Sequence, residues 1–232
     1  MFFRRDYSAP GPGIRPDEPE KTGFARLWQI VQIEAGSILK LNLLFLLTCV
    51  PVVTIPLAIF GMNQVIRKMM LDRPVLCFYD YRAAIRQGWK RAYAAFFIVA
   101  VPLAASGFGA YFYLLQAMER ILFLAPFVLC STVLLATLLS STYLYGLLGA
   151  GMDVRRAIRT ALILGLGNPL RAVPAVLCGH GLWLFGVLEF PISLMYLVFL
   201  GFSLPCLLAN FFARTLLRQY GADTDDAKEP QE

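Results

Sequence analysis

The feature that most constrains this chain is the length of its uncharged apolar stretches. Residues 92–116 contain no charged side chain, and neither do residues 121–150. Each stretch exceeds the roughly 20 residues that a helix needs to cross the hydrocarbon core of a bilayer. Only 16% of all residues are charged, against about 25% in soluble domains. The sequence therefore predicts an all-α fold, a polytopic transmembrane helix bundle.

The spacing of the apolar stretches predicts how the helices connect. Only four residues separate the two stretches above, so we expect an antiparallel pair. Further along we expect helices at about 170–188 and 191–219, the second kinked at Pro205 because proline removes a backbone hydrogen bond. These helices belong to one transmembrane domain, residues 24–219. Disordered tails are expected at 1–23 and 220–232, which are charged and rich in Pro or Gly.

The first apolar region, about 38–66, has two interpretations. It contains Pro51 and Pro56, each of which disfavours helical backbone at the residue before it. One kinked helix would give five membrane crossings in the whole protein. A hairpin, with helices at about 24–50 and 57–71 around a turn at 51–56, would give six.

The distribution of basic residues favours six crossings. Cytoplasmic loops are enriched in Lys and Arg, and both the 61–91 and 147–171 loops are strongly basic. These loops are therefore predicted to be cytoplasmic in a multi-pass cell-membrane protein. Six crossings put the basic N-terminal segment on the same side, with both termini cytoplasmic and the 51–56 turn outside.

The two basic loops share a sequence pattern, D-x-R-x-A-I-R, which starts at Asp80 and again at Asp153. Apolar residues follow each aspartate at helical spacing, and each aspartate stands where a helix N-cap is expected. We interpret the two segments as an internal duplication that forms two short amphipathic cytoplasmic helices, each leading into a transmembrane hairpin.

Arginine and lysine side chains on these two helices are candidate contacts for anionic lipid headgroups at the inner leaflet, or for an acidic partner protein. The candidate residues are Arg82, Arg86, Lys90, Arg155 and Arg159. The alternative is that they only fix the topology and hold the helices at the membrane surface.

Polar residues inside the apolar regions form a second hypothetical site, made of Asn42 and His180. His180 could relay protons, since its side chain titrates near neutral pH. The flanking Gly179 and Gly181 favour the simpler alternative, close packing of helices with a hydrogen bond between them. For the asparagines and Gln64 the simpler expectation is also hydrogen bonding between helices.

No catalytic, metal-binding or cofactor-binding residues are predicted, and we do not expect an enzyme. The single histidine has no nearby acidic partner in the sequence for a zinc site. The pattern GLGNP at 165–169 reads as a helix stop rather than a nucleotide-binding loop. A nucleic-acid partner is not expected either, because the basic residues lie in short loops between apolar stretches.

One region resembles a known family. Asn42-Leu-Leu, the Pro51-Val-Val-Thr-Ile segment and the aromatic basic stretch at 78–92 are similar to the YesL-like bacterial integral membrane proteins. The resemblance is strong over about 37–92. It implies a bacterial cell membrane and a link to carbohydrate uptake, but it supplies no catalytic residues.

These observations lead to two functional hypotheses. The first is a non-enzymatic accessory or scaffold protein that assists a carbohydrate transporter. The second is a small transporter or channel, with its substrate path at the broken first hairpin, because interrupted helices often line such paths.

Overall fold

In the computed structural model, residues 23–71, 73–189 and 194–219 are described, and every regular element in them is a helix. In chain order the elements are α1 (Phe24–Cys49), η1 (Val52–Thr54), α2 (Ile55–Met70), α3 (Cys77–Ala117), η2 (Ile121–Phe123), α4 (Leu124–Gly149), α5 (Val154–Gly167), α6 (Pro169–Val176), η3 (Leu177–Gly181), α7 (Leu182–Leu188), α8 (Leu194–Phe199) and α9 (Ser203–Gln219). The all-α prediction is confirmed for this part of the chain. The two predicted tails lie outside it, apart from residue 23.

The first apolar region is a hairpin, not one kinked helix. Helix α1 ends at Cys49 and α2 begins at Ile55, close to the predicted boundaries. Pro51 precedes the short turn η1 with extended backbone, and Pro56 lies in the first turn of α2. A proline costs little there, because the first amide groups of a helix have no intrahelical partner.

The position of this turn differs from the expected one. The Tyr93 hydroxyl donates a hydrogen bond to the Val53 carbonyl oxygen (2.9 Å). Tyr93 lies two residues after Arg91, so the turn lies at the basic end of the long apolar stretch of α3. In the six-crossing interpretation the turn lies outside, which would place it near Met118, at the other end of α3.

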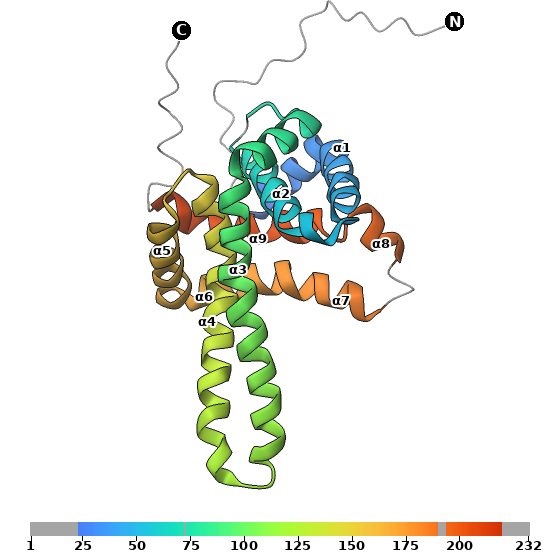
Figure 1. The fold of residues 1–232 in the computed structure, drawn as a ribbon. Coiled ribbons are helices and arrows are strands. Elements are labelled where there is room, and N and C mark those ends of the chain that lie inside the picture. The colour runs from blue at the N-terminus through green and yellow to red at the C-terminus, as the bar shows by residue number, and fades with distance from the viewer. Residues whose placement is uncertain (1–22, 72, 190–193, 220–232) are drawn as a thin grey trace, which may run out of the picture.

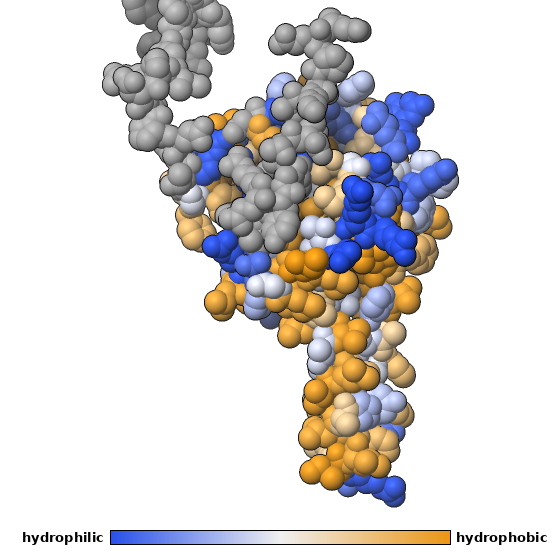
Figure 2. Space-filling model, turned by 90° about the vertical axis from the view of Figure 1, so that its left-hand side faces the viewer, coloured by the Kyte–Doolittle hydropathy of each residue, from blue (hydrophilic) through white to orange (hydrophobic). Residues whose placement is uncertain are grey.

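The longest elements are α3 and α4, which form an antiparallel hairpin that extends well beyond the other helices (Figure 1). Figure 2 shows that this narrow part is hydrophobic along most of its length and hydrophilic at its far end, while hydrophilic side chains gather on the wider part. Such a surface fits a helix pair surrounded by lipid.

Among the described residues, three helical stretches are long and apolar enough to cross a membrane: α1, α3 and the combined η2–α4 stretch. A fourth would be added if α5 and the α6–η3–α7 stretch, bent by 103° between them, formed one span. The chain is therefore a membrane protein by length and composition of its helices. The count of six crossings is not confirmed, since α2 has only 16 residues.

The first predicted cytoplasmic helix is not a separate element. Residues 79–92 form the beginning of the 41-residue helix α3, because no helix-breaking residue separates them from the apolar stretch that follows. The second predicted helix is separate, as α5. Asp153 is its N-cap and accepts a hydrogen bond from the Arg155 backbone amide (3.3 Å). It ends at Gly167, as the helix-stop pattern predicted.

The C-terminal part also differs from the prediction. The chain breaks between α8 and α9, at residues 200–202, and does not kink at Pro205, which lies in the first turn of α9. Gly201 makes this break possible: a Cβ there would lie 2.5 Å from the Cα of Leu197. The predicted helix end at 188 agrees with the end of α7, and the predicted boundary at 189–191 runs into residues outside the described ranges.

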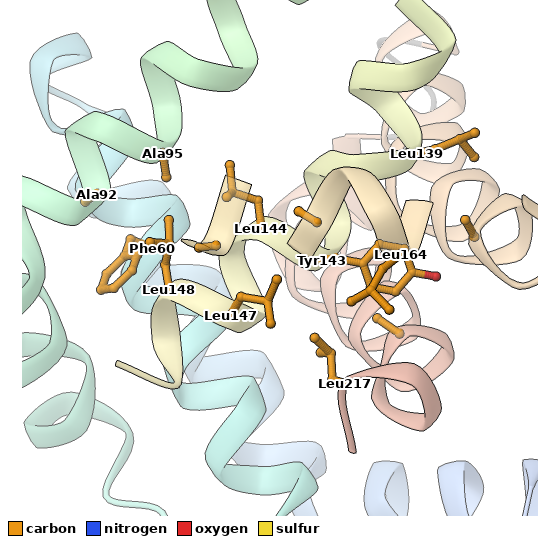
Figure 3. Close-up of a cluster of buried hydrophobic side chains, with 14 residues drawn as sticks. Phe60, Ala92, Ala95, Leu139, Tyr143, Leu144, Leu147, Leu148, Leu164 and Leu217 are labelled. Carbon is orange, nitrogen blue, oxygen red and sulfur yellow. The ribbon is translucent and has the colours of Figure 1, made fainter. Parts of the chain in front are cut away.

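Two clusters of buried apolar side chains hold the helices together. One joins α1 and α2 to Tyr81 of α3 and Leu207 of α9. The other is centred on Tyr143, Leu147 and Leu148 of α4 and receives side chains from five further helices, α2, α3, α5, α6 and α9 (Figure 3). Burying one such leucine contributes about 1.5–3 kcal/mol. The clusters fix α2 and α3 against the C-terminal end of α4, where the candidate site lies.

Candidate functional site

A basic cleft of about 300 Å³ lies between α2, the first turns of α3 and the end of α4. Its lining residues are Phe60, Gln64, Val65, Arg67, Lys68, Leu71, Arg73, Asp80, Ala83, Ala84, Gln87, Gly88, Arg91, Leu148 and Gly149. On α3 these residues recur every three or four positions, so they form one face of the helix. Small residues on that face leave the space that the cleft occupies.

The lining is strongly positive. It contains four basic side chains and one carboxylate among the described residues, and the carboxylate is already engaged. Lys68 Nζ lies 2.9 Å from Asp80 Oδ1, and Asp80 Oδ2 accepts a hydrogen bond from the Leu76 backbone amide (2.8 Å). That bond satisfies an amide at the start of α3, where a negative charge also interacts favourably with the helix dipole.

Two close contacts between helices shape the cleft. A Cβ at Gly88 would lie 2.2 Å from Cε1 of Phe60, and a Cβ at Gly149 would lie 2.0 Å from Nε2 of Gln64. Both glycines therefore let a side chain of α2 lie against a neighbouring helix. The Gln64 amide nitrogen is buried and has no hydrogen-bond partner in the described structure. The cleft thus combines cationic groups with an unused amide donor, a combination suited to an anion.

The basic residues predicted from the sequence lie outside this cleft. Arg82, Arg86 and Lys90 are exposed on α3 and do not line it. The ammonium of Lys90 lies 5.5 Å from the ring centroid of Trp89. Arg155 and Arg159 are exposed on α5. All five remain available to headgroups, but the structure does not gather them into one site.

Asn42, one of the two predicted intramembrane polar residues, is fully buried and holds the break between α8 and α9. Its amide nitrogen donates to the carbonyl oxygens of Leu197 (3.0 Å) and Val198 (2.7 Å). Its oxygen accepts hydrogen bonds from the backbone amides of Phe202 (2.9 Å) and Ser203 (3.0 Å). These four bonds use the full capacity of the side chain, so the geometry assigns Asn42 to structure rather than to a ligand.

His180, the other predicted residue, lies in the π-helical turn η3 and does not line the cleft. A Cβ at the neighbouring Gly179 would lie 3.0 Å from Cβ of Ala209, so η3 packs closely on α9 there, whereas a Cβ at Gly181 would have no atom within 4 Å. The predicted hydrogen bond is not seen at its Nδ1 atom, which has no partner among the described residues. A separate hydrogen bond between helices joins Asn210 Nδ2 to Asn63 Oδ1 (2.9 Å).

The cleft residues missed as a site are Arg67, Lys68, Arg73 and Arg91. The sequence shows these four residues in a basic loop, and that pattern predicts only the side of the membrane on which the loop lies. The sequence signal for the cleft lies on α3. There Ala83, Ala84, Gln87, Gly88 and Arg91 share one helix face, which is separate from the exposed row of Arg82, Arg86 and Lys90. No sequence pattern indicates that the end of α4 forms one wall of the cleft.

Comparison with known proteins adds one finding. Residues 38–108 match the family described as "Protein of unknown function, DUF624". The matched segment covers the second half of α1, all of α2 and most of α3, and so includes Asn42 and every cleft residue except the two from α4. No curated protein matches the chain, and no solved structure does.

Proposed function

We propose that this chain is a non-enzymatic accessory or scaffold protein of the bacterial cell membrane, which binds an anionic partner in the basic cleft. The observation that carries the proposal is the charge of the cleft: Arg91 lines it together with Lys68, whose ammonium lies 2.9 Å from Asp80, the one carboxylate in the described lining. Binding is favoured over catalysis because the described lining offers cations and amides and no cysteine, serine or histidine.

The orientation follows from the same charges. Basic loops face the cytoplasm, so the cleft and both termini are proposed to be cytoplasmic, with the α3–α4 hairpin as the anchor. Arg82, Arg86 and Lys90 would then lie near the anionic headgroups of the inner leaflet, where each basic residue contributes about 1 kcal/mol of attraction. Arg155 and Arg159 on α5 would add to this attraction.

The partner is proposed to be a membrane protein with an acidic cytoplasmic surface. The resemblance to YesL-like proteins is the sole support for a carbohydrate transporter in this role, because the family that matches residues 38–108 has no described function. The alternative, a transporter path through the first hairpin, has less support. Leu41, Val65 and Ile66 are fully buried where its helices meet, and Asn42 is already bonded.

The test is recovery of membrane partners after mild detergent extraction, from cells grown with and without sugar. Arg91→Glu reverses a charge inside the cleft, and Arg86→Glu reverses an exposed charge five residues earlier on the same helix. We expect Arg91→Glu to reduce recovery at least about tenfold, equivalent to about 1.4 kcal/mol. Arg86→Glu should recover nearly as much as the unmodified chain. Equal loss in both variants, or no reproducible partner under either growth condition, would contradict the proposal.

A further inference from the structure

The turn of the first hairpin exposes a group of apolar side chains. Val50, Val52 and Val53 are 76%, 75% and 72% exposed, and Pro51 lies between them. No charged residue occurs between Lys40 and Arg67, so the whole end of the hairpin is uncharged. An apolar end of this kind needs a covering that is itself apolar.

The level of the turn along α3 is fixed by contacts at both ends of α2. Lys68 pairs with Asp80 near the start of α3, and Val53 accepts the Tyr93 hydrogen bond two residues after Arg91. Helix α2 therefore runs antiparallel to the basic first part of α3. From Tyr93 to Met118, α3 and its C-cap continue without charge for about 37 Å, enough to cross a hydrocarbon core of roughly 30 Å.

Next to the turn, only short parts of the two hairpin helices are free of charged residues. Residues 41–50 rise by about 15 Å and residues 55–66 by about 18 Å. Along α3, the turn lies level with Tyr93, whereas Arg67 lies next to Lys68, which pairs with Asp80 thirteen residues earlier. Because the crossing of α3 starts at Tyr93, the turn lies at the beginning of the roughly 30 Å core and not at its centre.

The backbone of the turn is adapted to a water-free environment. The Thr54 hydroxyl shares its hydrogen between the carbonyl oxygens of Thr48 and Pro51. The Thr48 hydroxyl lies 2.6 Å from the Tyr81 hydroxyl, and Tyr93 satisfies the carbonyl of Val53. In lipid, non-helical backbone survives only where other groups of the protein satisfy its polar atoms.

We propose that the α1–α2 turn, residues 50–53, is a re-entrant segment. It enters the part of the acyl-chain region nearest the headgroups, on the side of the basic loops, and returns to that same side. The proposed covering is lipid, because the turn contacts Tyr93, and Phe97 and Val101 in the next two turns of α3 are exposed by 57% and 59%. This proposal does not depend on what the basic cleft binds.

Thiol labelling of the full-length chain in cells tests this proposal. The five native cysteines are replaced by alanine, and one cysteine is introduced by Val53→Cys. Met118→Cys at the far end of the α3–α4 hairpin and Leu76→Cys in the basic loop report the two sides of the membrane; their side chains are 81% and 68% exposed. Val52→Cys repeats the measurement at a second position in the turn.

We expect a membrane-impermeant maleimide to label Met118→Cys in intact cells and Leu76→Cys only after permeabilisation. Val53→Cys and Val52→Cys should react at least tenfold more slowly than Met118→Cys in intact cells, and at least tenfold more slowly than both control positions after permeabilisation. A bimane attached at position 53 should be quenched by nitroxide-labelled acyl chains in reconstituted vesicles. Labelling of both turn positions in intact cells as fast as Met118→Cys would show an outer turn. Labelling after permeabilisation as fast as Leu76→Cys, without lipid quenching, would show a turn in water.

The controls separate this proposal from the proposed orientation. If Met118→Cys and Leu76→Cys exchange their behaviour, the orientation is reversed. The slow reaction of the two turn positions would still support a re-entrant segment.

Discussion

Residues 79–92 and 152–165 carry the same sequence pattern but are used in two ways. The first copy begins the 41-residue helix α3, and the second is nearly the whole of the 14-residue helix α5. Both copies bury two small residues four positions apart: Gly88 and Ala92 in the first, Ala161 and Gly165 in the second. Paired small residues at this spacing let helix backbones approach closely in membranes.

The two copies differ where the basic cleft opens. Arg91 in the first copy corresponds to Leu164 in the second. Arg91 is exposed and lines the cleft, whereas Leu164 is fully buried in the cluster on α4 (Figure 3). The two copies thus differ at this one position. In the first copy it lines a cleft that is open to a ligand, and in the second it is packed in the core. The copies therefore share how they pack, and differ in whether that packing leaves room for a binding site.

The strongest test of this difference exchanges the two residues. Leu164→Arg would place a charge at a fully buried position and should destabilise the protein by several kcal/mol. Arg91→Leu should change stability by no more than about 0.5 kcal/mol, as is usual for exposed positions. Thermal unfolding in detergent measures both variants. Equal stability of the two variants would contradict the assignment of one face to the core and the other to a cleft.

The second test enlarges the small residues. A Cβ at Gly165 would lie 3.0 Å from backbone atoms of Leu139 and Ser140, which cannot move aside without shifting α4. Gly165→Leu should therefore cost about 3 kcal/mol. At Gly88 the obstacle is the Phe60 ring, a side chain that can rotate, so Gly88→Ala should cost about 1 kcal/mol. If Gly88→Ala proves the more damaging in the same unfolding assay, the close backbone contact is not specific to α5.

The smallest effect is expected at the aspartates that start the copies. Asp153→Ala removes the N-cap of α5 and should cost about 1 kcal/mol. Hydrogen exchange should show the loss in the first turn of α5 only. Asp80→Ala removes the bond to the Leu76 amide and the Lys68 pair, and should loosen the α2–α3 connection instead. Asp80 is not the N-cap that the sequence pattern predicted: the N-cap of α3 is Leu76, and Asp80 lies one turn inside the helix. Unchanged exchange in both regions would remove the capping role from Asp153 and the anchoring role from Asp80.

The sequence was sufficient for the elements that depend on local chemistry. Pro51 and Pro56 marked the first turn to within two residues, and Asp153 marked the start of α5, because each acts on its own backbone. It was not sufficient for the break before α9. That break depends on Asn42 bonding to residues about 155–161 positions later, and no local pattern records such a contact.

The candidate site shows the same limit. The positive charge of the 61–91 loop was visible in the sequence, but its use as a cleft depends on where α4 ends. Gly149 lies against Gln64, and Leu148 lies against Phe60, across 80 or more residues of chain. The exposed row of Arg82, Arg86 and Lys90 could be predicted as a candidate site because its residues recur every four positions. The cleft residues come from three helices and the α2–α3 connection, and only those on α3 share a helical spacing.

The four hydrogen bonds of Asn42 have a consequence for biosynthesis. The ribosome makes Asn42 about 155 residues before its first partner, Leu197. At roughly 5–20 residues per second, the α1 amide is in the growing chain for roughly 8–30 s before any of its final partners exists. During that interval it must bond to water, to the translocation machinery or to a temporary neighbour. The Asn42 side chain therefore reaches its final hydrogen-bond partners only after the C-terminal helices have been made.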